Sequence, residues 1–193
     1  MKLKKRIILG ITGASGVIYG IRCLEVLNKI AYVETHLVIS DGADKTIAIE
    51  TEYNTKTIRD LADFVHTPND MAASISSGSF LTSGMIVCPC SMKTLSGIVN
   101  SYNDNLLIRA ADVMLKEGRQ LIVVPRETPL HKGHLQLLTR LTDLGGIVIP
   151  PIPGFYHHPQ TIDDIIDHTI GKILDQFSLQ HELFDRWHGP EPL

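Results

Sequence analysis

Short apolar runs alternate along this chain with longer amphipathic segments. The apolar runs hold few polar residues, which is typical of strands that are buried on both faces of a sheet. The predicted strands are residues 6–12, 33–40, 85–88, 120–125 and 146–150. The predicted helices between them are residues 17–29, 41–50, 55–62 and 106–117 and a segment that ends near 144. This alternation predicts an α/β fold with a right-handed, doubly wound parallel sheet in three layers.

A last helix is predicted to begin at Thr161, where Asp164 completes a capping box. Lys172 lies at the edge of its apolar stripe, where a lysine extends to solvent or reaches an anion. The stripe itself consists of Ile162, Ile165, Ile166, Ile170, Ile173 and Phe177.

The long segment 69–84 is poor in large residues and is predicted to be a functional or mobile loop. Its large aromatic residue, Phe80, is expected either to cover a ligand or to anchor the loop by packing.

The turn after the first strand is rich in glycine and reads G-I-T-G-A-S-G at residues 10–16. Gly13, Ala14 and Ser15 let the backbone of a helix N-terminus approach an anion closely, so the turn predicts a phosphate-bearing ligand. The alternative is a tight turn that needs glycine for its geometry alone. The glycine spacing departs from the dinucleotide pattern, and the second strand ends on Ser40 rather than an acidic residue. Both departures leave room for a mononucleotide such as FMN.

Polar side chains follow other predicted strands. Ser91 and Thr94 place hydroxyls at a second strand-to-helix junction, although N-capping alone explains Ser91. Arg126 and Glu127 follow the strand 120–125, where Arg126 is suited to a phosphate or a flavin carbonyl and Glu127 to general acid or base catalysis. The alternative is a structural ion pair that fixes the loop. Because carboxyl ends of parallel strands share one edge, these residues are expected to converge with Ser40.

Arg109 and Lys116 are seven residues apart and project from nearly the same face of a predicted helix. Asp112 lies between them, so a surface ion-pair stripe is one interpretation. The helix is otherwise so apolar that it is expected to be covered, and cations on a covered helix need a carboxylate or a ligand phosphate. The proline-rich segment 150–159 places Tyr156 near the same edge of the sheet, as a core cap or a ligand contact.

Composition excludes several classes of protein. The 193 residues are 44% hydrophobic and 20% charged with net charge −3, which fits a globular domain without a nucleic-acid surface. We expect a cytoplasmic protein without a membrane segment, because apolar runs are too short to span a bilayer. Cys23, Cys88 and Cys90 are interpreted as buried thiols, and the H-x-x-H of His131 and His134 is not expected to bind a metal.

Several motifs in order closely resemble the flavin prenyltransferases, the UbiX-type proteins formerly called phenylacrylic acid or 3-octaprenyl-4-hydroxybenzoate decarboxylases. The resemblance runs from residue 7 to about 187. The motifs are G-I-T-G-A-S-G, E-T-H-L-V-I-S, S-S-G-S-F, P-C-S-M-K-T-L, R-A-A-D-V-M-L-K-E, R-E-T-P-L-H and P-P-I-P-G-F-Y-H-H-P. The resemblance implies a Rossmann-like flavoprotein fold that binds a flavin. The length predicts one domain, residues 1–193, and the tail from about 178, which lies outside the apolar pattern, is expected to pack on neighbouring subunits.

The same resemblance implies a metal-independent transfer of the dimethylallyl group of dimethylallyl monophosphate to N5 and C6 of reduced FMN. It assigns catalysis to Ser15 and Glu127. The implied FMN-binding residues are Gly13, Ala14, Ser15, Ser40, Ser91, Met92, Lys93, Thr94 and Arg126. The implied residues around the prenyl phosphate are Arg109, Lys116, Arg126, Tyr156 and Lys172. Lys172 keeps the charge of the arginine found in some relatives but loses its bidentate fork.

The implied product, prenylated FMN, serves a separate decarboxylase of ubiquinone or aromatic-acid metabolism, and the implied assembly is a homododecamer. The alternatives are a flavin-dependent cysteine-type decarboxylase and a non-catalytic flavin carrier or accessory subunit of a decarboxylase. Against the first, this chain reads P-C-S-M-K-T where those enzymes have a P-A-S-A-N-T-like segment. The sequence leaves open which decarboxylase receives the product and whether Glu127 acts on the flavin proton or the phosphate.

Overall fold

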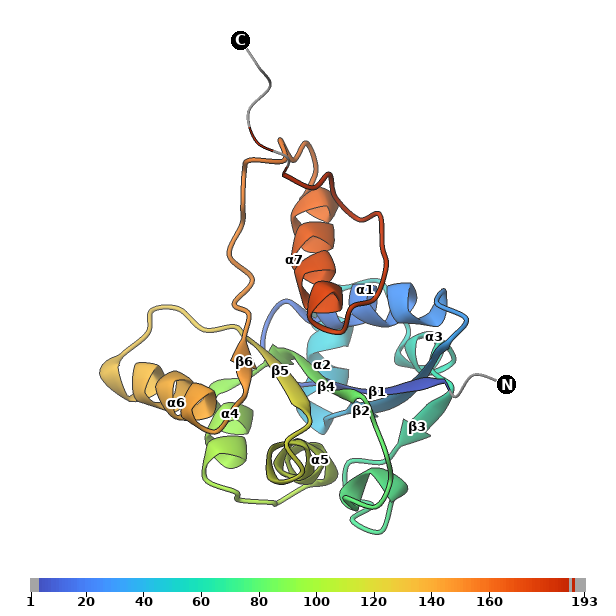
Figure 1. Cartoon of the computed structure of the whole chain (residues 1–193), viewed down its shortest axis with the longest axis vertical. Coiled ribbons are helices and arrows are strands. Elements are labelled where there is room, and N and C mark those ends of the chain that lie inside the picture. Colours follow the sequence, from blue (N-terminus) through green and yellow to red (C-terminus); the bar gives the residue numbers. More distant parts are fainter. Residues whose placement is uncertain (1–3, 188, 190–193) are drawn as a thin grey trace.

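The computed structural model describes residues 4–187 and 189, and in them one sheet of parallel strands has the order β3-β2-β1-β4-β5-β6 (Figure 1). The strands are β1 (Lys5–Ile11), β2 (Val33–Ile39), β3 (Phe64–His66), β4 (Gly84–Cys90), β5 (Gln120–Pro125) and β6 (Ile147–Val148). The helices are α1 (Val17–Asn28), α2 (Asp41–Glu50), α3 (Thr55–Arg59), α4 (Met92–Val99), α5 (Leu106–Lys116), α6 (Lys132–Asp143) and α7 (Ile162–Gln176). The predicted doubly wound parallel sheet is confirmed.

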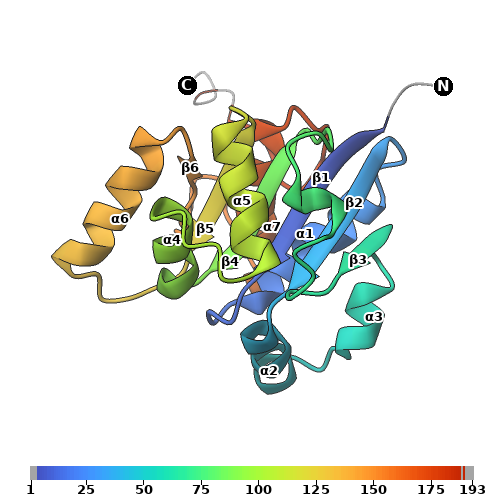
Figure 2. The same cartoon turned by 90° about the horizontal axis from the view of Figure 1, so that it is seen from below.

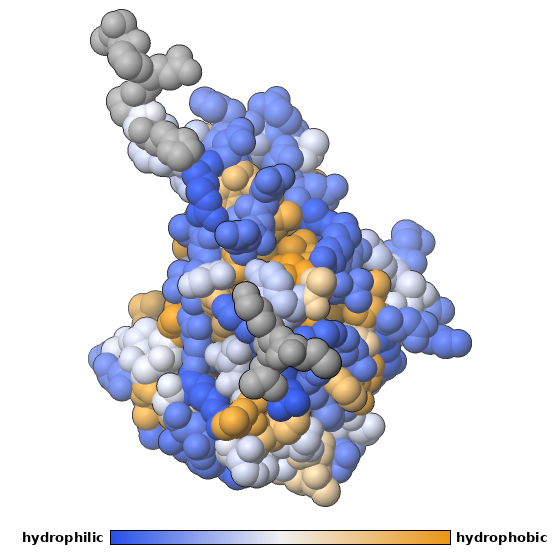
Figure 3. All heavy atoms as spheres, turned by 45° about the vertical axis from the view of Figure 1, so that its right-hand side comes forward, coloured by the Kyte–Doolittle hydropathy of each residue, from blue (hydrophilic) through white to orange (hydrophobic). Residues whose placement is uncertain are grey.

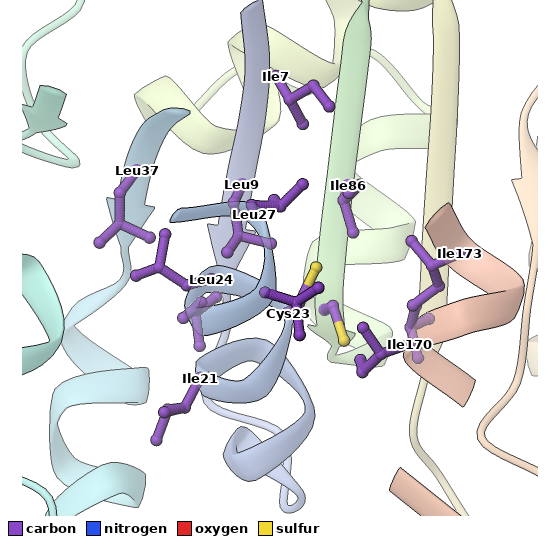
Figure 4. Packing of buried hydrophobic residues seen from close by; sticks show 14 of the residues in the cluster. Ile7, Leu9, Ile21, Cys23, Leu24, Leu27, Leu37, Ile86, Ile170 and Ile173 are labelled. Carbon is purple, nitrogen blue, oxygen red and sulfur yellow. The ribbon is translucent and has the colours of Figure 1, made fainter. Parts of the chain in front are cut away.

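Helices cover both faces of the sheet. Successive residues of β1 point to opposite faces, so Ile7 packs in the cluster with α1 and α7, whereas Ile8 packs in the cluster with α4 and α5. Figure 2 looks onto the second face, with α5 in front of the strands and α7 behind them. Figure 4 shows side chains of α1 and α7, among them Leu24 and Ile173, directed at the strands. A sheet covered on both faces explains why its central strands are apolar throughout.

One strand and the burial of one residue were not predicted correctly. β3 was missed because it has only three residues and forms the edge of the sheet. Ile162 was placed in the apolar stripe of α7 but is 77% exposed, because the helix begins there, beyond the edge of the core. The predicted capping box at Thr161 and Asp164 is present.

The segment 69–84 packs against the sheet and contains a single 3₁₀ turn, Ser74–Ser76. Phe80 lies against His36, with ring centroids 5.1 Å apart, and beneath the guanidinium of Arg6 at 4.7 Å. Arg119 donates hydrogen bonds to the carbonyl oxygens of Gly78 and Phe80. In this chain Phe80 is therefore a packing anchor, one of the two roles that the sequence left open.

The segment after β6, α7 and the chain beyond α7 project from the body of the molecule (Figure 1). The start of the predicted tail packs back onto α7, because Leu179 is buried and His181 lies 3.1 Å from the Asp175 carboxylate. The last part of that tail, residues 188 and 190–193, lies outside the described residues. Across residues 4–187, no helix is both long and apolar enough to cross a lipid bilayer.

Candidate functional site

The strand order creates a switch point between β1 and β4. From β1 the chain winds outward through β2 and β3, and from β4 it winds the opposite way through β5 and β6. The loops at the carboxyl ends of β1 and β4 therefore diverge and leave a crevice, which is where doubly wound sheets bind ligands. A cavity of about 370 Å³ opens there. Its lining residues are Thr12, Gly13, Ser40, Asp41, Gly42, Pro68, Asn69, Ser91, Lys93, Thr94, Asp104 and Asn105.

Two helix N-termini face this cavity. The Ser40 hydroxyl caps α2 by accepting from the amide of Ala43, at 3.2 Å. The Ser91 hydroxyl caps α4 by accepting from the amide of Thr94, at 3.3 Å. The positive ends of both helix dipoles favour a negatively charged ligand here. Lys93 adds a mostly exposed ammonium, 3.4 Å from Asp104.

Thr12 joins the two strands at the switch point, although sequence reasoning did not single it out. Its buried hydroxyl donates to the carbonyl oxygen of Pro89, at 2.8 Å, and accepts from the amide of Ser91, at 2.9 Å. These bonds fix the end of β1 beside the start of α4. The only sequence signal is a threonine that ends an apolar strand next to a glycine turn.

Gly13 is required by the close approach of two turns. A Cβ atom at Gly13 would lie 2.8 Å from the backbone carbon of Gly42, closer than side chains tolerate. The β1–α1 turn therefore lies directly against the start of α2, and Gly13, Ser40 and Gly42 all line the cavity.

The N-terminus of α1 is already bound to a carboxylate. Glu50, the last residue of α2, accepts from the amides of Gly16 at 2.8 Å and Val17 at 3.3 Å. In this structure an anion of the chain itself therefore occupies these two amides, so the phosphate expected at the glycine turn stays a prediction. Burial raises the pKa of Glu50, but hydrogen bonds from Ser15, Gly16 and Val17 and the charge of Arg126 together lower it below its usual value. Sequence reasoning missed Glu50 because it lies 34 residues from its partner Gly16.

Arg126 and Glu127 are both exposed where β5 ends. The amide of Arg126 donates to the carbonyl oxygen of Cys90, at 3.1 Å, which holds this loop beside the end of β4. The Glu127 carboxylate accepts from the amide of Thr128, at 3.0 Å. Within the described residues no salt bridge joins Arg126 to Glu127, so the structural ion pair is not formed here.

Arg109 and Lys116 lie on α5, away from the cavity. Arg109 donates to an Asp112 carboxylate oxygen at 3.1 Å and to the carbonyl oxygen of Ser76 at 3.1 Å, and Lys116 pairs with Glu117. The ion-pair interpretation thus holds for Arg109, whereas Lys116 pairs with its sequence neighbour rather than with Asp112.

Tyr156 and Lys172 belong to the projection on the other face of the sheet. The Tyr156 hydroxyl lies 2.7 Å from Nε2 of His168, and the Lys172 ammonium lies 4.0 Å from Asp175. α5 and α7 cover opposite faces, so the cations expected around one phosphate do not meet within a single chain (Figure 1).

The cysteines and the H-x-x-H motif have structural roles in this chain. Cys23, Cys88 and Cys90 are buried free thiols, and burial raises the pKa of Cys23 to about 12. His131 caps α6 by accepting from the amide of Gly133, and its ring centroid lies 3.6 Å from that of His134 with the ring planes tilted by 33°. Over residues 4–187 and 189, the His, Cys, Asp and Glu side chains form no group that could hold a metal ion.

The strand order and the anion-suited cavity at its switch point define a nucleotide-binding protein of the doubly wound class. The family model described as Flavoprotein matches residues 1–181. The flavin prenyltransferase UbiX of Salmonella typhimurium is 56% identical over 187 residues, which cover 96% of this chain and 99% of that protein.

Two solved structures extend the comparison. AnUbiX (PadA1), solved in complex with FMN and dimethylallyl pyrophosphate, matches with a TM-score of 0.95 and 49% identity over 97% of this chain and all of the other. A dodecameric FMN-dependent Ubix-like decarboxylase from Escherichia coli O157:H7 matches with a TM-score of 0.93 and 52% identity, over 95% and 100% of the two chains. The chain belongs to the UbiX family of flavin prenyltransferases, within the flavoproteins.

Proposed function

We propose that this protein is a flavin prenyltransferase, which joins the dimethylallyl group of dimethylallyl monophosphate to N5 and C6 of reduced FMN. The observation that carries the proposal is the anion-suited cavity at the switch point of a chain so similar to a relative solved with FMN and dimethylallyl pyrophosphate. The names of full-length relatives at 56% and 58% identity agree with it. Neither alternative, a cysteine-type decarboxylase or a carrier without activity, is favoured.

The FMN phosphate is assigned to the N-termini of α2 and α4. Those helix ends face the cavity with the hydroxyls of Ser40, Ser91 and Thr94, whereas the first amides of α1 are bound to Glu50. The cavity volume is within the range of small-molecule sites, and Gly13, whose turn packs against Gly42, lies in its wall. When bound, reduced FMN would supply the nucleophilic N5 and the C6 carbon. Four predicted FMN contacts do not line the cavity and remain proposals: Ala14, Ser15, Met92 and Arg126.

The catalytic groups are proposed to surround the reacting end of the flavin. Ser15 and the charge of Arg126 both contribute to lowering the pKa of the Glu50 carboxylate. Glu127, exposed beside Arg126, is proposed to accept the C6 proton or to protonate the departing phosphate. Holding both reactants in contact while water is excluded would supply the rest of the rate enhancement.

The prenyl phosphate is proposed to bind between copies of the chain. Arg109 and Lys116 of one copy would face Arg126, Tyr156 and Lys172 of another. Tyr156 would bind the phosphate, and the four cations would stabilise its negative charge as it leaves. An assembly of this kind, a homododecamer like that named for the Escherichia coli relative, would also cover apolar surface. Figure 3 shows hydrophobic atoms exposed in several separate areas. The exposed side chains include Phe64, Val65, Leu81, Ile152 and Phe155.

The whole chain is proposed to form one flavin-binding domain, with the end of the chain from about 178 also contacting neighbouring copies. The product is proposed to serve a separate decarboxylase of ubiquinone or aromatic-acid metabolism, and the protein to be cytoplasmic.

The test is an anaerobic incubation of the purified protein with reduced FMN and a dimethylallyl donor. We expect mass spectrometry to find a flavin heavier by one prenyl unit with the monophosphate. A parallel reaction with the pyrophosphate establishes which phosphate length the site accepts. Recovery of unmodified FMN from both reactions would refute the transferase function.

A Glu127→Gln variant separates catalysis from flavin carriage. It is expected to bind FMN like the wild type but to lose turnover, because the amide cannot exchange a proton at neutral pH. Glu52→Gln, which removes an exposed carboxylate elsewhere, is the matched control. Unchanged turnover in Glu127→Gln would remove this residue from the mechanism.

A further inference from the structure

A hydrogen bond joins Tyr156, in the extended segment after β6, to His168 in the middle of α7. The phenol oxygen lies 2.7 Å from Nε2 of the imidazole. His168 is 9% exposed and Tyr156 is 46% exposed, so a buried ring holds the polar end of a side chain that reaches solvent. The bond therefore fixes an exposed phenol at a defined place on the surface formed by α7 and the segment that follows β6.

Packing fixes the position of the His168 ring itself. The ring of His157 stacks on it with centroids 4.4 Å apart and 7° between the planes, and Phe184 lies at 4.8 Å. The backbone at Gly154 also lies close to the rings of both His168 and Tyr156. A Cβ atom there would lie 3.3 Å from Cε1 of His168 and 3.4 Å from Cε1 of Tyr156. The imidazole is therefore a rigid anchor for the phenol.

His168 also lies next to the cation expected at the prenyl phosphate. Lys172 is four residues further along α7 and thus on the same face of the helix. Burial, and then the charges of His157 and Lys172, lower the pKa of His168, so the ring is neutral at neutral pH. A neutral imidazole protonated at Nε2 donates to the phenol oxygen and leaves the phenol O–H free to donate to an anion.

We propose that His168 is a positioning residue for the prenyl donor: it holds the Tyr156 phenol so that its O–H meets the donor phosphate, with Lys172 on the same face of α7 as His168. This inference rests on the proposed function. A half-exposed tyrosine without this anchor would populate several rotamers and lose conformational entropy on binding. Preorganisation of this kind strengthens binding of the phosphate and leaves the bond-forming step largely unchanged.

The test is a double-mutant cycle of His168→Phe with Tyr156→Phe, because phenylalanine keeps a ring against His157 but has no nitrogen. We expect His168→Phe to raise KM for dimethylallyl monophosphate about three- to tenfold, the effect of one hydrogen bond, and to change kcat less than about twofold. In the Tyr156→Phe background, His168→Phe should not raise KM any further. His168→Gln, whose amide reaches the position of Nε2, should restore most of the affinity, and the shorter His168→Asn should not.

His181→Phe is the matched control, since it alters another buried histidine that packs on Phe184 but is bonded to Asp175. Three results would overturn the proposal. The first is that His168→Phe and Tyr156→Phe raise KM independently of each other. The others are a fall in kcat at constant KM in His168→Phe, and an equal rise in KM in His181→Phe. If His168→Phe does not fold, the comparison of the glutamine and asparagine variants decides, and equal KM values would refute it. The wild-type reaction separates the two hypotheses, because absence of prenylated flavin there refutes the proposed function itself.

Discussion

Thr12 and Glu50 are decisive at the scale of single residues, although neither has a chemically distinctive place in the sequence. Thr12 bonds to both Pro89 and Ser91 and so holds the two central strands together where the cavity opens. Glu50 binds the first amides of α1 and thereby leaves the helix ends beside Ser40 and Ser91 for a ligand. Each residue acts through a partner that is distant in the sequence.

Thr12→Val tests the junction between β1 and α4. The substitution keeps the shape of the side chain but leaves the buried Ser91 amide and Pro89 carbonyl without their partner, which costs about 1–3 kcal/mol of stability. We expect a lower melting temperature together with weaker FMN binding, measured by quenching of flavin fluorescence.

Thr35→Val is the control for that substitution. Thr35 is equally buried on β2, and its hydroxyl bonds to Asp63 at the opposite edge of the sheet. Thr35→Val should lower the melting temperature but leave the affinity for FMN unchanged. Equal loss of FMN affinity in both variants would show that general destabilisation, rather than the junction, controls binding.

At the scale of elements, local sequence signals determine where the helices begin. Ser40, Ser91 and Thr161 each cap a helix through a side-chain oxygen, and the first two also place that helix end at the cavity. The cap at Thr161 has a different consequence, because α7 carries His168 and Lys172. Loosening its first turn acts on the part of the chain that holds Tyr156.

Thr161→Ala is expected to lower the free energy of unfolding by about 1 kcal/mol, because the Asp164 amide loses its acceptor. For a chain of this length that is about 2–4 °C in melting temperature, measurable by calorimetry. Thr139→Ala, an exposed position within α6, should not destabilise, since alanine is the better helix former. A melting temperature unchanged in Thr161→Ala would show that the capping box contributes nothing to stability.

At the scale of the whole molecule, the sheet separates α5 from α7, and this separation is the reason for our proposal that the phosphate site is shared between copies. Mixed assemblies test this directly. Arg109→Ala and Lys172→Ala should each be inactive alone, whereas co-expression should restore activity in about a quarter of the sites, because random mixing of two contributing copies forms that fraction of intact sites. Activity of the purified mixed assemblies is the measurement.

Arg109→Ala mixed with Lys116→Ala is the control, because both residues come from the same α5 and no mixture supplies an intact helix. It should remain inactive. Failure of the first mixture to recover activity would mean that a single chain provides the complete site.

The sequence by itself determined the layers, the caps at Ser91 and Thr161 and the candidate residues, because helical periodicity, apolar runs and turn chemistry act over a few neighbouring positions. It predicted the doubly wound sheet and the junctions at Ser40 and Ser91, and its motifs indicated the family. Only the tertiary structure decided which residues meet. It placed Glu50 where a phosphate was expected on α1, and it put Arg109 and Tyr156 on opposite faces. Such contacts depend on how strands distant in the sequence pair, which local patterns do not encode.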